Sequence, residues 1–534
     1  MFLLEEFSLI VGIDLGTVKS IVGYWDEVEN IPKIIPAKNG KNFIPSLVLV
    51  DKFGDIHVGW DAFNHPDKYK EKTNYISSVK RVMGTKGDTD RDQLHTYPQE
   101  ISALILDELK KQAENYLQTT VSKAVISIPS HFDDNQRRAT LEAAQIADLE
   151  VVRLLNEATA VALRYKQLSD NKSDERILVF DMGGGTTDVS VIEAGEGVYE
   201  VLNVKGDSQL GGNDIDVLIA NYIKQQLKYQ YDIDTIDDKF DKFESYLLDK
   251  ASELKEALSF HNSYDIDLHM IADKYKKSQK IQITLSRDQF LSFSSDLLDK
   301  TLSIMDLALK DSNINSNTLS CCILIGGGCF IPYIQEKVKS MFHCPVRIIT
   351  DNSWVTQGSV IQGSLFSGHT KEMVLLDIVP ASYGIGTLGG IFTPILEKNT
   401  VIPTKKSTNV TLDLNYYQDI GPTQYYSEIT IQVYTGEQGE ARKNVHLTNL
   451  ILKLNRRYMK TKLPTFAVTI EIDSNMLLSA SVKELGTNNI TSAIIRAPFG
   501  LNQTQISLMK KKIIDRKIPL NIKRKFLKYF NFVK

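Results

Sequence analysis

The sequence predicts two similar α/β halves, followed by an all-β module and a short helical tail. Each half opens with the same pattern at residues 9–25 and 177–193: an apolar strand ending in aspartate, a glycine turn with hydroxyl residues, and a second apolar strand. Alternating strand and helix patterns follow each hairpin. Between residues 381 and 500 helix patterns nearly vanish and short strands alternate with turns, which predicts the all-β module.

Composition limits the classes of protein to consider. The chain has 534 residues, 42% of them apolar, which is enough for several domains with ordinary cores. Its net charge of −4 excludes nucleic-acid binding driven by bulk charge. The absence of any run of 18 apolar residues predicts no membrane span, and the N-terminal stretch lacks the basic start of a secretory signal. The four cysteines have no C-x-x-C spacing and are expected to be reduced thiols, which favours a cytoplasmic location.

The elements of each module follow from apolar periodicity and cap residues. In the first half we expect a helix, a strand, a helix, a strand and a helix capped by Asn156, at residues 100–118, 124–129, 133–147, 150–155 and 157–166. In the second half we expect two helices, a strand and a helix from Pro332, the first three at residues 213–229, 244–259 and 322–328. Strands of the β module are expected at residues 407–414, 427–436, 466–473, 475–484 and 490–497.

The two hairpins carry residues suited to a polyphosphate and magnesium. Asp14 and Asp181 each stand at a strand end, and the glycines that follow can bring backbone N–H groups close to a phosphate. A carboxylate in this place can hold hydrated Mg²⁺, which prefers oxygen ligands and keeps most of its waters. One such hairpin alone is an ordinary β-turn. Two of them, about 165 residues apart, favour a site in which both hairpin turns bind one polyphosphate from opposite sides.

Two further glycine clusters, at residues 204–216 and 324–332, each lead into a helix. Backbone donors and a helix N-terminus can accept an anion or a nucleotide there. Neither cluster contains the Walker pattern G-x-x-x-x-G-K-[ST], and neither is a clear Rossmann fingerprint.

A series of segments resembles one family. In order they are "GIDLGTVKS", "SSVKRVMG", "VISIPSHFDDNQRRAT", "VVRLLNEATAVAL", "VFDMGGGTTDVSVI", "GDSQLGGNDID", "LIGGGCFIP", "VLLDIVPASYGIGTLGG" and "GLN". This order resembles DnaK-type (heat-shock-seventy) chaperones over about residues 9–505. The segments "SSVKRVMG", "HFDDNQR" and "VVRLLNE" are more similar to HscA, the member devoted to iron–sulfur cluster assembly, than to DnaK.

The resemblance implies an architecture and a function. It implies an actin-like (ribonuclease-H-like) two-lobed ATPase domain, an interdomain linker, a peptide-binding β-sandwich and a truncated basic helical tail, at residues 1–370, 371–380, 381–500 and 501–534. Slow ATP hydrolysis, with ATP or ADP and Mg²⁺ bound, would be coupled to binding and release of extended or unfolded client peptides. The implied partners are a J-domain co-chaperone and, for an HscA-like member, an iron–sulfur scaffold protein.

Individual roles are also implied by the resemblance. Asp14 and Asp181 would order the waters of Mg²⁺ with support from Glu157, while Lys80 would orient the attacking water and Asp188 would polarise it. Phosphoryl transfer to water needs placement and charge neutralisation more than covalent chemistry, which suits these side chains. Without the resemblance, Lys80 is an ordinary surface lysine. The implied nucleotide-binding residues are Gly16, Thr17, Gly184, Gly185, Thr186, Gly211, Gly212, Lys255, Ser259, Gly326, Gly327 and Phe330.

Two further sets of residues are implied, one for coupling and one for peptide binding. The relay between domains would use Glu157 together with Pro129, Arg137, Leu375, Leu376 and Asp377. Pro129 also fits a plain strand terminator, and the linker also fits the first strand of the β module. The peptide groove would be lined by Ile385, Leu388, Val410, Ile429 and Ile431. Alternation places Ile429 and Ile431 on one face, but a buried sheet face would show the same pattern.

Several positions depart from the family pattern: Val18, Lys19, Ala158, Glu256 and Phe330. Lys19 beside a polyphosphate would either tighten binding or point to solvent. Phe330 stands where an arginine normally covers the adenine, so a ring can still stack on the base but the cationic sandwich is lost. We therefore expect ATP affinity to differ from the family more than hydrolysis does.

The end of the chain is the largest departure. After Leu501 only 33 residues remain, and between Lys510 and Lys534 ten Lys or Arg face a single acidic residue, Asp515. Pro519 interrupts any helix there. We expect a short helix in place of a full lid, either solvated or in weak contact with an anionic partner or a membrane surface.

Other functions remain open at this stage. An actin-fold small-molecule kinase shares the phosphate hairpins but lacks the linker and the β module. In a non-hydrolysing binding protein the departures would mark a decayed ATPase, although the retained Asp14, Lys80 and Asp181 argue against it. A general DnaK-like folding chaperone is the alternative to the iron–sulfur role.

Overall fold

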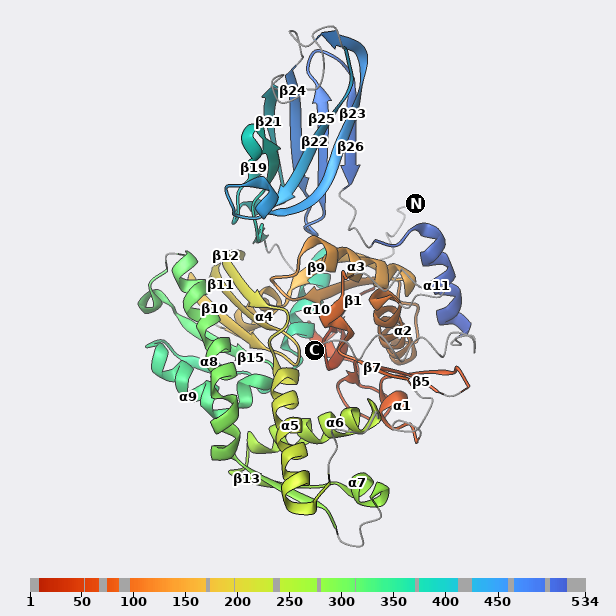
Figure 1. Ribbon diagram of the computed structural model, residues 1–534, viewed down its shortest axis with the longest axis vertical. Helices are drawn as coiled ribbons and strands as arrows, with labels where there is room; N and C mark the ends of the chain where they lie inside the picture. The colour runs from red at the N-terminus through yellow and green to blue at the C-terminus, as the bar shows by residue number, and fades with distance from the viewer. Residues whose placement is uncertain are drawn as a thin grey trace.

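The computed structural model describes residues 9–51, 53–66, 74–85, 97–169, 173–195, 197–233, 241–275, 280–312, 314–369, 374–411, 425–459, 465–494 and 500–515. The first three residues of the expected linker, 371–373, and the last part of the expected tail, 516–534 with Pro519, lie outside these described residues. The α/β part occupies one end of the molecule and the β module the other (Figure 1).

The first half is built on a six-stranded sheet in the order β3-β2-β1-β8-β9, with β4 also paired to β2. Its strands are β1 (Ile10–Leu15), β2 (Lys19–Asp26), β3 (Ile31–Ile34), β4 (Ile44–Pro45), β8 (Lys123–Ile128) and β9 (Glu150–Asn156). A small sheet in the order β6-β5-β7 accompanies it, with β5 (Leu47–Val50), β6 (Ile56–Val58) and β7 (Asn74–Ser77). The helices are α1 (Trp60–Phe63), α2 (Pro98–Leu117) and α3 (Asp134–Ile146).

The second half is built on a seven-stranded sheet in the order β16-β15-β10-β11-β12-β17-β20. Its strands are β10 (Glu175–Met182), β11 (Thr187–Gly195), β12 (Val198–Asp207), β15 (Cys321–Ile325), β16 (Val346–Ile348), β17 (Val374–Ile378) and β20 (Val401–Ile402). The helices are α4 (Glu157–Leu168), α5 (Gly212–Tyr231), α6 (Asp241–Leu258), α7 (His269–Lys274), α8 (Arg287–Ser312), α9 (Pro332–Met341) and α10 (Trp354–Phe366). A separate hairpin joins β13 (Ser263–Asp267) to β14 (Gln282–Ser286).

Local signals decide several of these elements. Helix α3 begins at an acidic cap: the Asp133 carboxylate accepts the backbone N–H of Gln136, and the Gln136 side chain accepts the backbone N–H of Asp133. Cys321 and Cys322 lie on opposite faces of β15, in two different core clusters, as alternation predicts. All four cysteines are free thiols.

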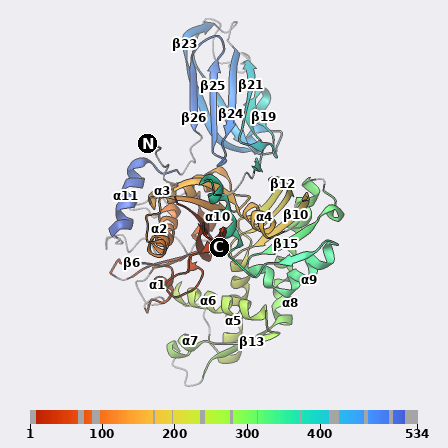
Figure 2. The same ribbon diagram turned by 180° about the vertical axis from the view of Figure 1, so that it is seen from behind.

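The β module is a sandwich of two four-stranded sheets, β19-β18-β22-β23 and β21-β24-β25-β26 (Figures 1 and 2). The strands are β18 (Tyr383–Thr387), β19 (Ile391–Leu396), β21 (Thr404–Thr411), β22 (Tyr425–Thr435), β23 (Val445–Met459), β24 (Thr465–Ile472), β25 (Leu478–Glu484) and β26 (Ile490–Ile494). Apolar side chains from both sheets form one core between them, with Val433 and Phe466 fully buried. Burial of such a face is the main term that stabilises a sandwich of this kind.

Strand β17 joins the two modules. It runs parallel to β12, with Val198 opposite Val374 and Glu200 opposite Leu376, and it also pairs antiparallel with β20 through Asp377 and Ile402. The described part of the expected linker is therefore a strand of the second-half sheet that lies between β12 and β20, and β20 leads into the β module. Its role as a linker stays a prediction.

Helix α11 (Gln503–Asp515) lies along α2 and α3 of the first half (Figures 1 and 2). Ile506, Met509 and Ile513 are buried in the core cluster of that half. Lys510 Nζ lies 2.6 Å from Asp148 Oδ1, and Lys512 Nζ donates to Glu100 Oε1 at 3.0 Å. The expectation of a solvated tail is wrong for these residues. The apolar face of the helix is buried, and Lys510 and Lys512 pair with acidic residues of the first half.

Among the described residues, no helix has both the length and the apolar character needed to cross a membrane.

Candidate functional site

Four carboxylates and one lysine meet between the two halves. Lys80, in the 3₁₀ turn Val79–Val82, donates from Nζ to Glu157 Oε1 at 2.6 Å, and Glu157 is the first residue of α4. Asp14, near the end of β1, accepts from Ser127 Oγ at 2.9 Å. Asp181 and Asp188 face each other in the β10–β11 register. The five charged side chains named for catalysis are thus brought together.

Burial governs the electrostatics of this cluster. It raises the pKa of Asp181 well above its ordinary value, and the carboxylates of Glu157 and Asp188 raise it further. Burial also raises the pKa of Glu157 to about 7, although Lys80 opposes the shift. For Lys80 burial alone lowers the pKa, but Glu157 and Asp14 outweigh it and hold the pKa above its usual value. The cluster holds more negative charge than its cations neutralise.

This imbalance fits a divalent cation. The donor set consists of carboxylate oxygens, which Mg²⁺ prefers, and Asp14 and Asp181 keep part of their surface accessible to its waters. Asp188 Oδ2 is buried and has no hydrogen-bond partner among the described residues, which marks a place for a water or a ligand. Asp14, Asp181 and Glu157 are therefore suited to hold hydrated Mg²⁺.

The glycine turns of both halves converge on the carboxylates. A Cβ on Gly184 would collide with the side chain of Val18, and a Cβ on Gly185 would collide with Thr17. A Cβ on Gly211 would lie only 2.8 Å from the backbone of Gly185, so the third turn packs on the second. At Gly211 the residue must stay small because the backbones of the second and third turns meet there. The structure brings together Gly16, Thr17, Gly184, Gly185, Thr186, Gly211 and Gly212.

The fourth turn differs in its surroundings. Gly326 has φ of +90°, and a Cβ there would press on Asp181, so glycine is required. A Cβ built on Gly327 would meet no other part of the structure within 4 Å, so the space beside this residue is open.

A pocket adjoins these turns at Ile331 and at Lys255, whose Nζ contacts the Gly212 carbonyl. It is lined by the expected Lys255 and Ser259 together with Leu258, Arg287, Phe290, Leu291, Ile331, Pro332 and Tyr333. Phe330 immediately precedes Ile331, and its ring centroid lies 6.4 Å from that of Phe260. Arg287 was not expected from the sequence, because no motif surrounds it and only the packing of α8 brings it here. Phe260 was not expected either, although it directly follows Ser259.

Lys255 links this pocket to the third turn. Its Nζ lies 2.7 Å from Asp216 Oδ1 and donates to the Gly212 carbonyl at 2.9 Å. Burial raises the pKa of Asp216 to about 6, and the Lys255 ammonium opposes that rise.

Two of the departures from the family pattern pair with each other. Lys19 Nζ, on the first hairpin, lies 4.0 Å from Glu256 Oε1 on α6, and 5.0 Å from the ring centroid of Phe43. Both charged side chains are largely exposed, so the pair contributes about 0–1 kcal/mol. The sequence left open whether Lys19 binds phosphate or points to solvent. In the structure its side chain points toward Glu256 of the other half.

Further contacts also cross between the halves. Arg81 Nη2 donates to Asp214 Oδ1 at 3.1 Å, and Asn213 Nδ2 donates to Ser78 Oγ at 2.7 Å. Arg81, which follows Lys80, and Ser78, two residues before Lys80, therefore hold the first half against the start of α5.

His131 is a charged neighbour that sequence analysis missed. Its Nδ1 lies 2.6 Å from Asp188 Oδ1, which also accepts the His131 backbone N–H at 3.3 Å. Burial by itself lowers the pKa of His131, but Asp188 outweighs it and holds the pKa above its usual value. The available signal was its place just after β8, a strand whose neighbour β1 carries Asp14.

A chain of contacts leads from this site to β17. Arg137, 2% exposed, donates from Nη2 to Asn156 Oδ1 at 3.3 Å, and Asn156 Nδ2 donates to Asp377 Oδ2 at 2.6 Å. Asn156 precedes Glu157, the partner of Lys80. Asn156 is the N-cap residue of α4, as expected, but its side chain makes no capping hydrogen bond, because Arg137 and Asp377 are its partners instead.

The other relay residues lie around this chain. The Pro129 carbonyl accepts the backbone N–H of Phe132, whose own carbonyl accepts Arg137 Nε at 2.9 Å. Leu375 is buried and Leu376 half-buried in β17.

The β-sandwich itself also contacts the first half. Asp134 Oδ1 accepts the Leu478 backbone N–H at 3.2 Å, and Arg138 Nη2 donates to the Leu478 carbonyl at 2.9 Å. Asn475 Oδ1 accepts the Leu154 backbone N–H at 3.0 Å. Helix α3, which carries Arg137, and strand β9, which ends at Asn156, are thus the elements that meet the sandwich.

The five residues expected to bind peptide do not share one accessible surface here. Ile385, Ile429 and Ile431 are 2%, 2% and 5% exposed and pack in the sandwich core. Val410 is half-buried against that core, whereas Leu388 is 53% exposed. A peptide could touch Leu388 directly, but it could reach the isoleucines only if the sandwich opened.

The fold and the site define a class of protein: two α/β halves around a cleft suited to a polyphosphate with its cation, joined by a strand to a β-sandwich. The model of the Hsp70 protein family matches residues 10–96 and 88–518, and the chain belongs to that family. Members of the family bind ATP or ADP with Mg²⁺, hydrolyse ATP, and act on client peptides with J-domain co-chaperones. The resemblance seen in the sequence is confirmed at the level of the family.

Proposed function

We propose that this chain is an ATP-dependent chaperone that couples slow ATP hydrolysis in the cleft to binding and release of extended peptide by the β-sandwich. The observation that supports it most is the contact chain from Lys80 and Glu157 through Asn156 to Asp377. This series of contacts links the charged cluster to β17, the strand that leads into the sandwich.

The charged cluster suits hydrolysis of a phosphoanhydride. Bound Mg²⁺ would neutralise phosphate charge, held by Asp14, Asp181 and Glu157. Lys80 would place its ammonium beside the terminal phosphate, and Asp188 Oδ2, buried without a partner among the described residues, would accept a hydrogen bond from the attacking water. Positioning and charge stabilisation of this kind account for most of the catalysis of phosphoryl transfer.

The pocket beside Phe330 would receive the adenosine. Lys255 and Ser259 would contact its polar edge, and the aromatic rings of Phe330 and Phe260 lie near the pocket mouth. Stacking on these rings would replace part of the cationic contact that the departure at Phe330 removes.

A steady-state ATPase assay of the purified chain tests the proposal, with and without a J-domain protein and an unfolded client peptide. We expect slow turnover that both additions raise. Tight ATP binding with no turnover under any of these conditions would favour the non-hydrolysing binding protein instead.

A narrower proposal concerns the client. The segments similar to HscA support a role in maturation of iron–sulfur proteins in the cytoplasm. Binding to a scaffold-type iron–sulfur protein should then exceed binding to a generic unfolded client. Equal binding to both would favour a general folding chaperone.

A further inference from the structure

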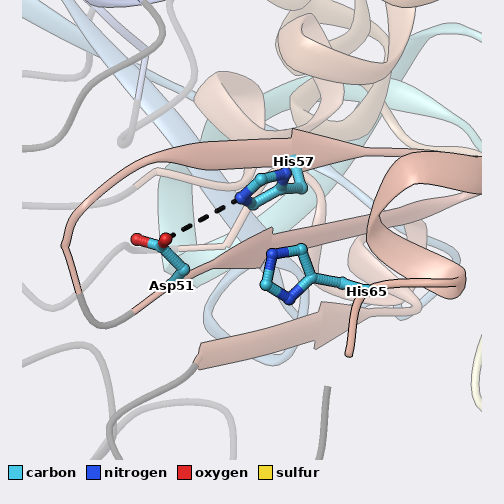
Figure 3. A group of neighbouring side chains, drawn as sticks. All are labelled: Asp51, His57 and His65. Atoms are coloured by element: carbon cyan, nitrogen blue, oxygen red, sulfur yellow. Dashed lines mark ion pairs between the residues drawn. The ribbon is translucent and has the colours of Figure 1, made fainter. Parts of the chain in front are cut away.

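Three side chains that commonly bind metals meet on the small sheet β6-β5-β7, away from the cluster around Lys80. Asp51 follows β5, His57 is the middle residue of β6, and His65 follows α1. One ligand atom from each of the three lies within 4.8 Å of the others. Figure 3 shows the three side chains gathered on one side of the β5–β6 hairpin, with Asp51 and His57 turned toward each other.

Neighbouring groups prepare His57 to act as a ligand. Its Nδ1 lies 2.7 Å from Asp61 Oδ2, so the Nδ1–H donates to that carboxylate and Nε2 keeps its lone pair. Carboxylate–histidine pairs of this kind fix the ring and raise its basicity in metal sites. Nε2 is buried and has no hydrogen-bond partner among the described residues.

Asp51 is prepared in a similar way. Its Oδ1 accepts the backbone N–H groups of Phe53 and Asp55, at 2.8 and 2.9 Å, which fixes the carboxylate. Its Oδ2 then lies 4.0 Å from His57 Nε2. That distance is too long for a hydrogen bond. It is also slightly longer than the roughly 3.3–3.6 Å that separates two ligands of a tetrahedral ion, so binding would draw the carboxylate and the ring together by about 0.5 Å.

A plain ion pair explains the arrangement less well. If His57 were protonated, its Nε2–H would face Asp51 without forming a hydrogen bond and would stay unpaired in a buried place. The rings of His57 and His65 are also in contact, tilted by 48° with centroids 4.2 Å apart, but this contact gives no partner to His57 Nε2. An ion would satisfy Nε2 and the free oxygen of Asp51 together.

We propose that Asp51, His57 and His65 bind one divalent transition-metal ion, with Zn²⁺ the preferred occupant. Two imidazole nitrogens and one carboxylate oxygen suit Zn²⁺, whereas Mg²⁺ and Ca²⁺ prefer oxygen alone. The carboxylates of Asp51 and Asp61 supply compensating negative charge. Three protein ligands leave one position for water, and the side chain of His57 is 20% exposed, which gives the ion a way in.

The test is titration of the full chain, without a histidine tag, with Zn²⁺ by calorimetry and with Co²⁺ by visible absorption. We expect one saturable site whose Co²⁺ bands are those of a tetrahedral N/O site without thiolate charge transfer. His57→Ala or His65→Ala should weaken binding at least tenfold, and Asp61→Asn about 10- to 100-fold. His343→Ala, at an exposed histidine elsewhere, is the matched control and should bind as the wild type does.

The proposal is overturned if the wild type shows no saturable site, or if His57→Ala and His343→Ala bind Zn²⁺ equally. It is also overturned if the Co²⁺ spectrum shows thiolate ligation. Circular dichroism in the absence of metal checks that each variant is folded. Should His57→Ala fail to fold, Asp61→Asn decides, because Asp61 is largely exposed and does not bind the ion directly.

Discussion

Lys80 donates a hydrogen bond to Glu157 in the charged cluster, and its burial makes it sensitive to mutation. We expect Lys80→Ala to lower the ATPase rate about 10²- to 10³-fold, because one preorganised charge at the phosphate is lost. ATP should still bind through the glycine turns. Single-turnover hydrolysis and nucleotide titration measure the two effects separately.

Lys19→Asn is the control for that prediction. Its exposed pair with Glu256 contributes about 0–1 kcal/mol, so ATP affinity should change less than about fivefold. A loss of turnover as large as that of Lys80→Ala would show that Lys19 reaches the phosphates after all.

His131 gives the fold a pH dependence through Asp188. Because the pKa of His131 is raised above its unfolded value of 6.5, the pair stabilises the fold fully below that pH and less as the pH rises through the folded pKa. Glu157 and Asp207 act in the same direction. His131→Asn should therefore cost about 1–3 kcal/mol at pH 6 and less at pH 9, measured by urea unfolding without nucleotide. An equal loss at both values would contradict this assignment.

At the scale of elements, β17 is held by hydrogen bonds to β12 and by the buried Asp377. Burial raises the pKa of Asp377, and Arg137 opposes that rise, so the carboxyl depends on its partners. We expect Asn156→Ala to weaken coupling between ATP and peptide by about 1–3 kcal/mol, roughly 5- to 150-fold, while basal hydrolysis persists. The ATP-induced change in peptide affinity is the measurement.

The matched control is Asn317→Ala, at an exposed asparagine in the second half. It should leave coupling intact. Unchanged coupling in Asn156→Ala would show that β17 communicates by another route.

Helix α11 depends on a partly buried ion pair. Burial raises the pKa of Glu100, and the Lys512 ammonium opposes that rise. Lys512→Ala leaves this carboxylate unpaired and should destabilise the docked helix by about 1–3 kcal/mol, seen as faster hydrogen exchange in α11. Adding Glu100→Gln should restore part of the loss, and a double variant no better than Lys512→Ala would argue against the pair.

At the scale of the whole molecule, local patterns predicted more than distant contacts did. The hairpins around Asp14 and Asp181 follow from strand alternation and turn residues a few positions apart, and both are present. The cap at Asp133 has a short-range signature too. In contrast, Lys19 and Glu256 meet only because the two halves face each other, which no local pattern encodes.

Helix α10 shows why some elements escaped prediction. Its sequence, "WVTQGSVIQGSLF", is rich in glycine, serine and β-branched residues, which disfavour a helix. It forms because it packs against α4 and β1, and Gly358 allows close approach to the Ala160 backbone. Tertiary packing here outweighs intrinsic propensity.

The side chain of Asn156 makes the same point at the site. Its position before α4 predicts a side-chain cap, but the side-chain amide is hydrogen-bonded to Arg137 and Asp377 instead. A partner 221 residues away cannot be inferred from the cap motif.

If the proposed function is correct, the rate of ATP hydrolysis depends on bound peptide. The ATPase rate of the purified chain with Mg²⁺ is followed as an extended client peptide is added, for the wild type and for Asn156→Ala. We expect peptide to raise the ATPase rate of the wild type and to have much less effect on the rate of Asn156→Ala. A wild-type rate that is absent, or that peptide leaves unchanged, would contradict it.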